Sequence, residues 1–437
     1  MNPRLTSYDV TPRLLTVGET AEVRIRPRFH HAALPAAARV EVVVCERDTR
    51  QRHPIEARRD DAGGLTVCLT PQREQEIVLA VTATVEGQTA RREEFPLFAV
   101  RPDLIGLRPW KGDIHLHSSR SDGREAPAYV AAACRQIGLD FMALTDHRNY
   151  RASLEAQAAF QGLAIDFRIF PGEEVHPPDN PVHMVNAGGS FSVQDLMADR
   201  AAYDAEIARR AEAMPPGLTP DERRMMASCQ WVFEQIRRGD GISILCHPYW
   251  ITGDAHNITE DLQDALYAAR AFDTLEVIGG FFRHQMESNA LAVARWQQCR
   301  AAGQDMPVVG VSDAHGCERG ELFGWYYSIV FAPSTDWADL RQAMRDSRSL
   351  AVEAVSGEFP RLVGPFRLVK LGYFMLREIL PLHDELCVEE GRLMRGHAAG
   401  DTAAARALEA LGGRVAALYD SLWGRADNGR RAPSRPA

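Results

Sequence analysis

The chain has 437 residues, more than one typical domain, and its 45% hydrophobic and 25% charged content is that of a globular protein with a large core. The net charge of −9 is spread along the chain, and the basic cluster Arg430, Arg431 and Arg435 is confined to the last residues, which argues against nucleic acid as a partner. Without a signal-peptide pattern at the start or an apolar window of about 18 residues, we expect a cytoplasmic protein that does not enter a membrane. The eight cysteines show no CxxC spacing, so we expect reduced thiols, including Cys246 and Cys317.

Short apolar and β-branched runs, separated by Gly, Pro and polar turns, follow one another up to about residue 100. The runs are Ala21–Ile25, Arg39–Cys45, Leu65–Leu69, Ile77–Val85 and Glu94–Val100. Strands of this length and spacing predict an antiparallel β-sandwich of immunoglobulin-like type over residues 1–105.

From residue 106 to residue 357 the pattern alternates between strands and helices. The predicted strands are Asp113–His117, Phe141–Thr145, Phe167–Phe170, His183–Asn186, Ile242–Cys246, Thr274–Val277, Val308–Val311 and Tyr326–Phe331. Pro127–Ile137 has helical spacing, and Thr219-Pro220-Asp221-Glu222 is a strong helix start. Alternating β and α units predict an α/β fold with a closed parallel barrel, distorted or with fewer than eight strands.

The last part of the chain, residues 358–437, is predicted to be a helical extension. Val363–Glu390 is too apolar for a free helix in solvent, so it must bury one face against the barrel or against a second copy of the chain. Ala403–Trp423 is predicted as a second amphipathic helix, and Gly424–Ala437 as a disordered tail. Homo-oligomerisation through these helices is therefore one expectation.

The barrel segment carries a set of imidazole and carboxylate side chains with no thiolate among its members. Divalent zinc, manganese and iron favour nitrogen and oxygen donors, and a set of this size suits two or three such ions. The candidate ligands are His115, His117, Asp122, His147, Glu174, His183, His247, Asp313 and His315.

Most of these residues stand where a predicted strand ends. His115 and His117 are two residues apart, so on a strand both rings face the same side, although such a pair alone could also simply pack or hydrogen-bond. The strings ending in His147, Glu174 and His247 follow other apolar strands in the same way. Because the carboxyl ends of barrel strands meet at one mouth, we expect the ligands to gather there.

The ordered strings HxH, SDG, TDH, PGxE, a later His, CHP and SDAH resemble the polymerase-and-histidinol-phosphatase (PHP) superfamily over about Trp110 to Val355. The resemblance implies a distorted (β/α)7 TIM-like barrel. It further implies three ligand groups, and the PGxE register favours Glu174 over Glu173 as the bridging carboxylate. The first ion would be held by His115, His117 and Asp313, the second by Asp122, His147 and His315, with Glu174 bridging and a third site completed by His183 and His247.

The same resemblance implies a hydrolase in which two or three zinc, manganese or iron ions activate water. Phosphoester hydrolysis is the leading reaction, with Asp313 as both ligand and proton acceptor. One PHP branch with an added sandwich-like module resembles carbaryl hydrolase (CehA/McbA-like), so hydrolysis of a carbamate or carboxyl ester is the alternative. A non-enzyme alternative is a metal-stiffened scaffold whose sandwich is a binding module.

Further residues near the predicted mouth are candidate contacts for a small-molecule substrate. An arginine can bind phosphate in a bidentate manner, and a histidine that is not a ligand could protonate a leaving alkoxide. His284 is the candidate acid, although a solvent-exposed role is equally compatible with its position. The candidate substrate contacts are Arg148, Tyr249, Trp250, Arg283 and Arg319, each of which could instead be a surface ion pair or a packing residue.

Overall fold

The computed structural model describes residues 6–214, 217–318 and 321–425, and these divide into two compact units. Unit 1 runs to Leu107 and includes Phe374–His383 and the chain from Gly413 onward. Unit 2 contains Arg108–Tyr373 and Asp384–Gly412. The C-terminal helical segment therefore contributes to both units, whereas the division into three domains remains a prediction. Most of the expected tail lies outside the described residues.

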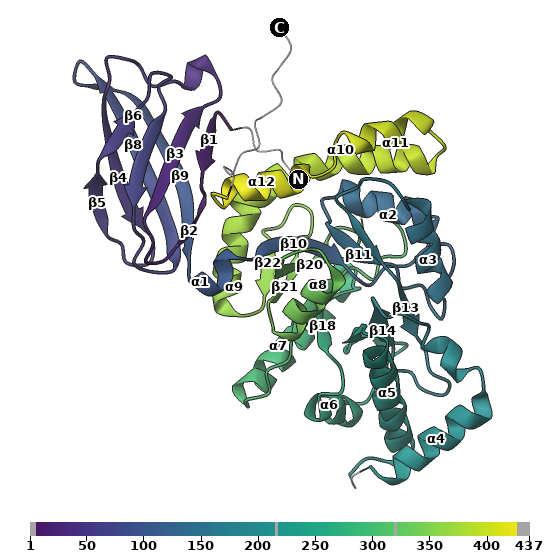
Figure 1. The fold of residues 1–437 in the computed structure, drawn as a ribbon. Coiled ribbons are helices and arrows are strands. Elements are labelled where there is room, and N and C mark those ends of the chain that lie inside the picture. Colours follow the sequence, from purple (N-terminus) through teal and green to yellow (C-terminus); the bar gives the residue numbers. More distant parts are fainter. Residues whose placement is uncertain (1–5, 215–216, 319–320, 426–437) are drawn as a thin grey trace. The chain divides into compact units, whose positions relative to one another are not determined.

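Unit 1 is built on two sheets, with strand orders β1-β3-β7-β6 and β2-β9-β8-β4-β5 (Figure 1). Its strands are β1 (Tyr8–Thr11), β2 (Leu14–Thr16), β3 (Ala21–Pro27), β4 (Arg39–Glu46), β5 (Arg52–Ile55), β6 (Ala57–Arg59), β7 (Leu65–Leu69), β8 (Gln75–Val85) and β9 (Gln88–Val100). Alternate residues such as Val23, Val42 and Leu79 are buried, and both sheets contribute to one core. The five predicted strands are all present, and the immunoglobulin-like identity remains a prediction.

Unit 2 has a six-stranded sheet, β12-β11-β10-β20-β21-β22, and a five-stranded sheet, β13-β14-β15-β18-β19. Its strands are β10 (Arg108–Asp113), β11 (Phe141–Ala143), β12 (Arg168–Phe170), β13 (Gly172–Val175), β14 (Met184–Ala187), β15 (Ile242–Leu245), the small pair β16 (Ile251–Thr252) and β17 (Ala255–His256), β18 (Thr274–Gly279), β19 (Val308–Val311), β20 (Tyr326–Ala332), β21 (Ser349–Glu353) and β22 (Arg361–Val363). Apolar side chains from both sheets, such as Phe141, Val185 and Val309, form one core.

The prediction of a mixed α/β fold is confirmed, but the prediction of a closed, all-parallel barrel is wrong. β10 pairs antiparallel with β20, and β14 pairs antiparallel with both β13 and β15. Strands buried on both faces are continuously apolar, and this pattern does not record strand direction. Two isolated parallel bridges, Leu116 with Ala314 and His147 with Glu174, link the sheets at the end that carries the candidate ligands.

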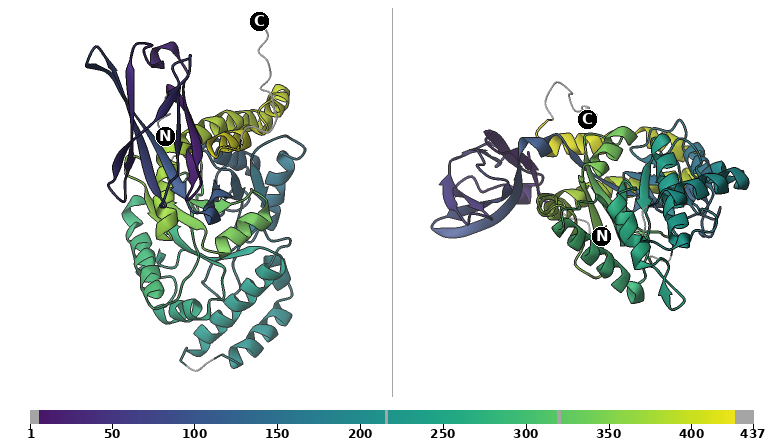
Figure 2. Two further views of the ribbon diagram at one scale, coloured as in Figure 1. Left: turned by 60° about the vertical axis from the view of Figure 1, so that its left-hand side comes forward. Right: turned by 90° about the horizontal axis from the view of Figure 1, so that it is seen from below.

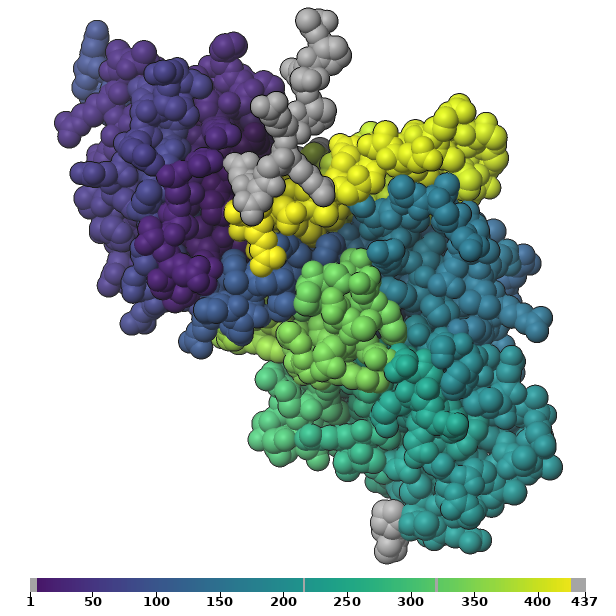
Figure 3. All heavy atoms as spheres, in the orientation of Figure 1, coloured from purple at the N-terminus to yellow at the C-terminus, as the bar shows by residue number. Residues whose placement is uncertain are grey.

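Helices cover the sheets of unit 2, and α2 packs with α3 beside β11 and β12 (Figure 1). The helices of this part are α2 (Pro127–Gln136), α3 (Tyr150–Ala159), α4 (Arg200–Glu212), α5 (Pro220–Arg238), α6 (Glu260–Ala269), α7 (Glu287–Ala301) and α8 (Trp337–Arg345). Figure 2 shows α4 and α5 side by side, and α8 lies on the visible face of unit 2 in Figure 3. The predicted start of α5 is confirmed by a complete capping box between Thr219 and Glu222.

The C-terminal segment is more interrupted than predicted. Its helices are α9 (Phe366–Phe374), a π-helical turn (Met375–Ile379), α10 (Leu380–Ala398), α11 (Thr402–Glu409) and α12 (Arg414–Leu422), and the short α1 (Pro102–Ile105) belongs to unit 1. The single predicted helix Ala403–Trp423 is wrong, because Gly413 adopts a left-handed φ of 81° that breaks it. No helix within the described ranges is long and apolar enough to cross a bilayer.

Candidate metal centre

The candidate ligands of unit 2 lie just beyond its strands. His147 follows β11 by four residues, and His247 and Asp313 follow β15 and β19 by two residues each. Glu174 lies within β13, and His183 immediately precedes β14. Residues far apart in sequence are therefore brought to one end of both sheets, as expected for catalytic groups at strand ends.

The strand that precedes the HxH motif ends earlier than predicted. β10 is Arg108–Asp113 rather than Asp113–His117, because its pairing with β20 stops at Gly112. His115 and His117 therefore lie in the following loop. The bridge at Leu116 keeps this stretch extended, and the two imidazole rings lie 5.3 Å apart.

Glu174 is the central residue of the cluster, and its side chain is completely buried. Its Oε2 atom lies 2.6 Å from Nδ1 of His147 and 3.4 Å from Nε2 of both His115 and His117. Its Oε1 atom lies 2.9 Å from Nδ1 of His183. One carboxylate thus contacts imidazoles on several sides, which suits a bridging role between cations.

The residues assigned to a first ion lie together. Oδ1 of Asp313 is 2.8 Å from Nε2 of His117 and 3.2 Å from Nε2 of His115. One donor atom from each of these residues and from Glu174 lies within 4.8 Å of the others. This spacing is compatible with a shared cation.

A second group lies beside the first. The Oδ2 and Oδ1 atoms of Asp122 lie 3.3 Å from the Nε2 atoms of His147 and His315, respectively. His117 belongs to this group as well as to the first, because its donor atom lies within 4.8 Å of the other three. The two groups therefore share His117, the second histidine of the HxH motif.

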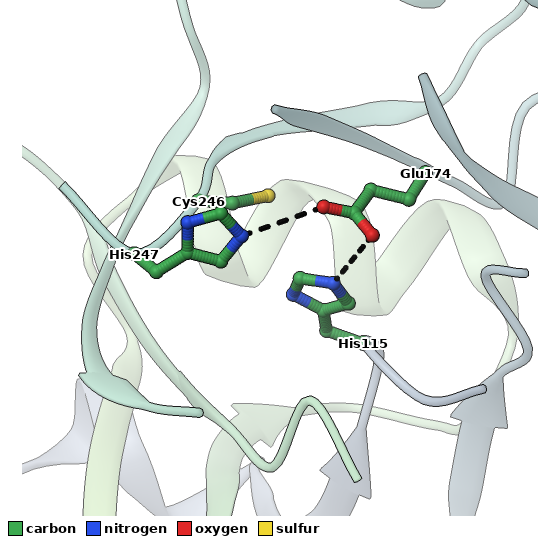
Figure 4. Close-up of side chains that lie close together, drawn as sticks. All are labelled: His115, Glu174, Cys246 and His247. Atoms are coloured by element: carbon green, nitrogen blue, oxygen red, sulfur yellow. Dashed lines mark hydrogen bonds and ion pairs between the residues drawn. The ribbon is translucent and has the colours of Figure 1, made fainter. Parts of the chain in front are cut away.

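The residues assigned to a third site also meet at Glu174. Nε2 of His247 lies 3.4 Å from Oε1 of Glu174, and the rings of His183 and His247 lie 5.0 Å apart. Figure 4 shows His247 and His115 each reaching one of the two carboxylate oxygens of Glu174, with the sulfur of Cys246 nearby. All nine candidate ligands are thus collected in one cluster, and their ligand roles remain predictions.

Several buried polar atoms of this cluster make no hydrogen bond within the described part of the chain. They are Nε2 of His115, Nδ1 of His117 and Oε2 of Glu174. Buried polar atoms without partners cost free energy, and cations would satisfy both the carboxylate and the imidazole nitrogens. The donor set therefore fits divalent metal ions.

The electrostatics of the cluster suit cation binding. Burial favours the neutral form of Glu174 and Asp313, but the surrounding imidazoles outweigh it and lower the pKa of both carboxyl groups below their usual values. Burial lowers the pKa of His117, and it lowers the pKa of His183 to about 4, whereas nearby carboxylates outweigh burial and raise the pKa of His115, His147 and His247. Metals bind the ionised carboxylate and the neutral imidazole, so a cation would displace protons from those three rings.

Carboxylates behind the ligands hold the loops in place. Asp146 accepts hydrogen bonds from the backbone N–H and hydroxyl of Ser118 and from the hydroxyl of Ser121. Glu276, buried in β18, places Oε2 2.9 Å from Nδ1 of His115. A carboxylate on the second ring nitrogen fixes the orientation of a ligating histidine and increases its basicity.

One glycine and two strained residues shape the same loops. A Cβ atom at Gly123 would lie 2.6 Å from the backbone of His117, so the SDG string requires glycine. His247 and Asp313 have positive φ angles of 26° and 47°, which side chains rarely adopt. Strain at two candidate ligands is typical of a functional site.

Two cavities open onto the cluster. The smaller, of about 160 Å³, is lined by Asp122, His147, His183, His247, Trp250, Gly280, Phe281, Asp313 and His315. The larger, of about 350 Å³, is lined by Arg124, Glu125, Trp250, Gly280, Phe282, Gln285, Asp313, His315, Gly316, Glu321 and Leu322. A small molecule in the larger cavity would contact apolar rings and the candidate ligands Asp313 and His315 together.

Of the predicted substrate contacts that the structure describes, only Trp250 lines these cavities. Tyr249 is 7% exposed and packs against His256. Arg283 forms an ion pair with Glu358 and lies over the ring of Trp325, so its guanidinium is engaged at the surface.

The remaining predicted contacts lie elsewhere or are not described. Arg148 and His284 are exposed and line neither of these two cavities, and the ring of His284 stacks on Phe282. Arg319 lies outside the described residues. The structure instead places Arg124 at the larger cavity, directly after the SDG string.

Sequence reasoning missed three further residues of the cluster. His176 lies 2.8 Å from His147 through their ring nitrogens and shares a donor group with Glu174. Its position two residues after Glu174, on the same side of an extended chain, was a usable signal. Glu276 was visible as a single charge in an apolar strand, whereas nothing in the sequence indicates that Cys246 joins His115, Glu174 and His247.

Comparisons with known proteins give limited matches. No family model matches the chain. Over 58 residues it is 40% identical to the DNA polymerase/3'-5' exonuclease PolX of Bacillus subtilis, a match that covers 13% of this chain and 10% of PolX. Because the chain spans so small a part of that curated relative, PolX's polymerase and exonuclease activities are not assigned to it.

Solved structures give fold-level likenesses. A two-domain protein with a predicted PHP-like metal-dependent phosphoesterase from Bacteroides vulgatus is 20% identical, with a TM-score of 0.38 over 57% of this chain and 66% of that one. A candidate metal-dependent phosphoesterase from Bifidobacterium adolescentis is 21% identical, with a TM-score of 0.33 over 48% of this chain and 90% of that one. With TM-scores below 0.5, the chemistry of the centre is inferred from its own side chains. The chain resembles PHP-like proteins, as its motifs predict, and its place in the carbaryl-hydrolase branch remains a prediction.

Proposed function

We propose that this protein is a metal-dependent hydrolase that cleaves phosphoesters. The observation that carries the proposal is the gathering of nine imidazole and carboxylate side chains, with Glu174 at the centre, in which several buried polar atoms make no hydrogen bond within the described residues. A cavity large enough for a small substrate adjoins two of them, Asp313 and His315.

Divalent ions would be held by the residues that the PHP resemblance implies, with Glu174 shared between ligand groups. Divalent ions bound there supply Lewis-acid activation of water and neutralise charge on phosphoryl oxygens. Asp313, whose pKa is held low despite burial because of the imidazoles around it, stays ionised and is the candidate acceptor for a proton from water. The larger cavity is the candidate substrate site, because Asp313 lines it together with Arg124 and Trp250.

Arg124 is the anion contact that favours phosphate. Its backbone N–H donates to the carbonyl of His315 at 3.0 Å, and its side chain lies against Gly316 and lines the larger cavity. No acidic side chain of the described residues pairs with it. A guanidinium held beside the candidate ligands is suited to bind two phosphoryl oxygens at once.

Hydrolysis of an aryl carbamate or carboxyl ester is the second candidate. Trp250, Phe282 and Leu322 give the larger cavity an apolar wall, which would accept an aromatic leaving group. The same activated water can attack a planar carbonyl carbon. The apolar wall alone does not require phosphate, so the test must separate the two reactions.

The test uses metal-free protein reloaded separately with Mn²⁺, Zn²⁺ or Fe²⁺ and given an aryl phosphomonoester, an aryl phosphodiester and an aryl carbamate. We expect phosphoester cleavage with at least one metal. His117→Ala should lose bound metal and activity together, whereas His256→Ala, an exposed histidine of β17, should keep both. Cleavage of the carbamate with neither phosphoester touched would overturn the proposal.

Arg124→Ala separates the two candidates further. Loss of a hydrogen bond to a charged group costs about 1.5–3 kcal/mol, so kcat/KM for the phosphoester should fall about 10- to 100-fold, with little change for the carbamate. Arg120→Ala is the matched control, because Arg120 follows the same HxH motif but pairs with Glu155 at the surface. Equal losses in both variants would remove Arg124 from the substrate site.

A further inference from the structure

The CHP string places a thiol at the metal centre. Cys246 is 4% exposed, and its Sγ atom lies within 4.8 Å of donor atoms of His115, Glu174 and His247. Figure 4 shows the sulfur next to the imidazole of His247 and toward the carboxylate of Glu174. This sulfur was not among the ligand types that the sequence pattern predicts.

The surroundings of Cys246 leave its sulfur available. The thiol donates a long hydrogen bond of 3.7 Å to the carbonyl of Ile244, in its own strand, and it also interacts with the imidazole of His115 inside the cluster. Beside it, Nε2 of His115 is buried without a hydrogen-bond partner among the described residues. The sulfur and this ring nitrogen therefore face the same small space as the carboxylate of Glu174.

The spacing fits one ion. In a tetrahedral zinc site, with Zn–S distances of about 2.3 Å and Zn–N distances of about 2.1 Å, two donors lie about 3.6 Å apart. The donor atoms of this group lie within 4.8 Å of one another, so an ion would have to draw them closer together by up to about 1 Å. Small side-chain rotations would bring the group together.

We propose that Cys246 is a metal ligand of this centre and binds as a thiolate together with Glu174 and His247. Its thiol proton leaves for solvent when the ion binds. The proposal rests on the metal centre of the proposed function but not on the reaction, and it adds one soft donor to a set otherwise made of nitrogen and oxygen.

A thiolate changes which ion the centre prefers. Sulfur ligands favour zinc, whereas carboxylate and water ligands suit manganese. With Cys246 as ligand, the position next to Glu174 and His247 should therefore take zinc in preference to manganese. Removing the sulfur should shift that preference toward manganese.

The test uses full-length, metal-free protein loaded with Co²⁺, with the bound metal counted by elemental analysis. We expect wild type to show a near-ultraviolet sulfur-to-cobalt charge-transfer band that Cys246→Ala lacks. Cys299→Ala is the matched control, because Cys299 is buried in α7 outside the cluster, and it should keep the band. Equimolar Zn²⁺ and Mn²⁺ should give a lower bound Zn:Mn ratio in Cys246→Ala than in wild type.

The outcomes are distinguishable. A protein that binds no stoichiometric cobalt overturns the metal centre itself, and with it the proposed function. Bound cobalt without the band in wild type, or a band that survives in Cys246→Ala, overturns the thiolate alone and leaves the phosphoesterase proposal standing. If Cys246→Ala does not fold, Cys246→Ser, which keeps the size of the side chain, serves as the second variant and should likewise lack the band that Cys299→Ala keeps.

Discussion

Replacing Lys111 with methionine should destabilise unit 2 by about 3–5 kcal/mol, because it removes one partner of a buried ion pair. Nζ of Lys111, on β10, lies 2.9 Å from Oδ1 of Asp384, on α10, and both residues belong to unit 2. The two side chains are 2% and 8% exposed. The pair therefore lies out of water, at the strand that leads to His115.

The magnitude follows from the geometry. At an effective dielectric constant of about 20, opposite charges 2.9 Å apart attract by about 6 kcal/mol, and the cost of removing both from water offsets most of this. Burial lowers the pKa of Lys111, but the carboxylate of Asp384 outweighs burial and raises it above its usual value, so the amine stays charged. Without the amine, the carboxylate of Asp384 stays buried but loses its cationic partner, which is the source of the expected loss.

Urea unfolding of metal-free protein, followed by tryptophan fluorescence, measures this loss. Of the seven tryptophans only Trp423 lies in unit 1, so the signal reports on unit 2. Arg120→Met breaks a 2.7 Å ion pair with Glu155 whose side chains are about half exposed, so it should cost much less than Lys111→Met.

A second substitution tests the cause. In Lys111→Met/Asp384→Asn the buried negative charge is removed as well, so the double variant should regain at least about 1 kcal/mol over Lys111→Met. If Lys111→Met costs no more than Arg120→Met, or if the double variant is no more stable than the single one, the argument from the buried charge is refuted.

Two further predictions concern residues behind the ligands. Glu276→Gln should weaken metal affinity about 10- to 100-fold in a chelator-competition titration, because the carboxylate 2.9 Å from Nδ1 of His115 orients that ring; unchanged affinity would remove this role. Asp113→Asn should flatten the pH dependence of urea unfolding in metal-free protein. Burial raises the pKa of Asp113 to about 7, whereas its value in the unfolded chain is about 4. Between these two pH values the folded state holds one more proton than the unfolded state. The free energy of unfolding therefore falls as pH rises through this window, by at most about 4 kcal/mol in total. An equally steep dependence in the variant would contradict this assignment.

The ligands could be predicted from sequence because each is a local signal. A titratable residue directly after a continuous apolar run is rare in a core, so the strings ending in His147, His247 and Asp313 stood out without knowledge of the fold. The register of PGxE separated two adjacent glutamates, and the structure turns Glu173 toward Ser192 and Asn186 instead of the cluster. Periodicity of two was sufficient for that distinction.

Strand direction and substrate contacts could not be predicted in the same way. β14 runs antiparallel to its neighbours, yet its four buried residues are those of a parallel core strand. An exposed loop arginine carries no pattern, and its role depends on which acid happens to lie near it. Glu358 engages Arg283 far along the chain, whereas Arg124 stays at the cavity.

The carboxylates that position the ligands were not predicted from the sequence, and the physical reason is the same for each. Asp113, Asp146 and Glu276 are buried carboxylates that accept from, or lie beside, groups 2 to 199 positions away in sequence, so their partners exist only in the folded chain. Each holds a loop that carries a candidate ligand, and each would be costly to bury without those partners. The same folding event that satisfies these carboxylates therefore also orients His115 and its neighbours, which makes the donor geometry a property of the protein before any cation arrives.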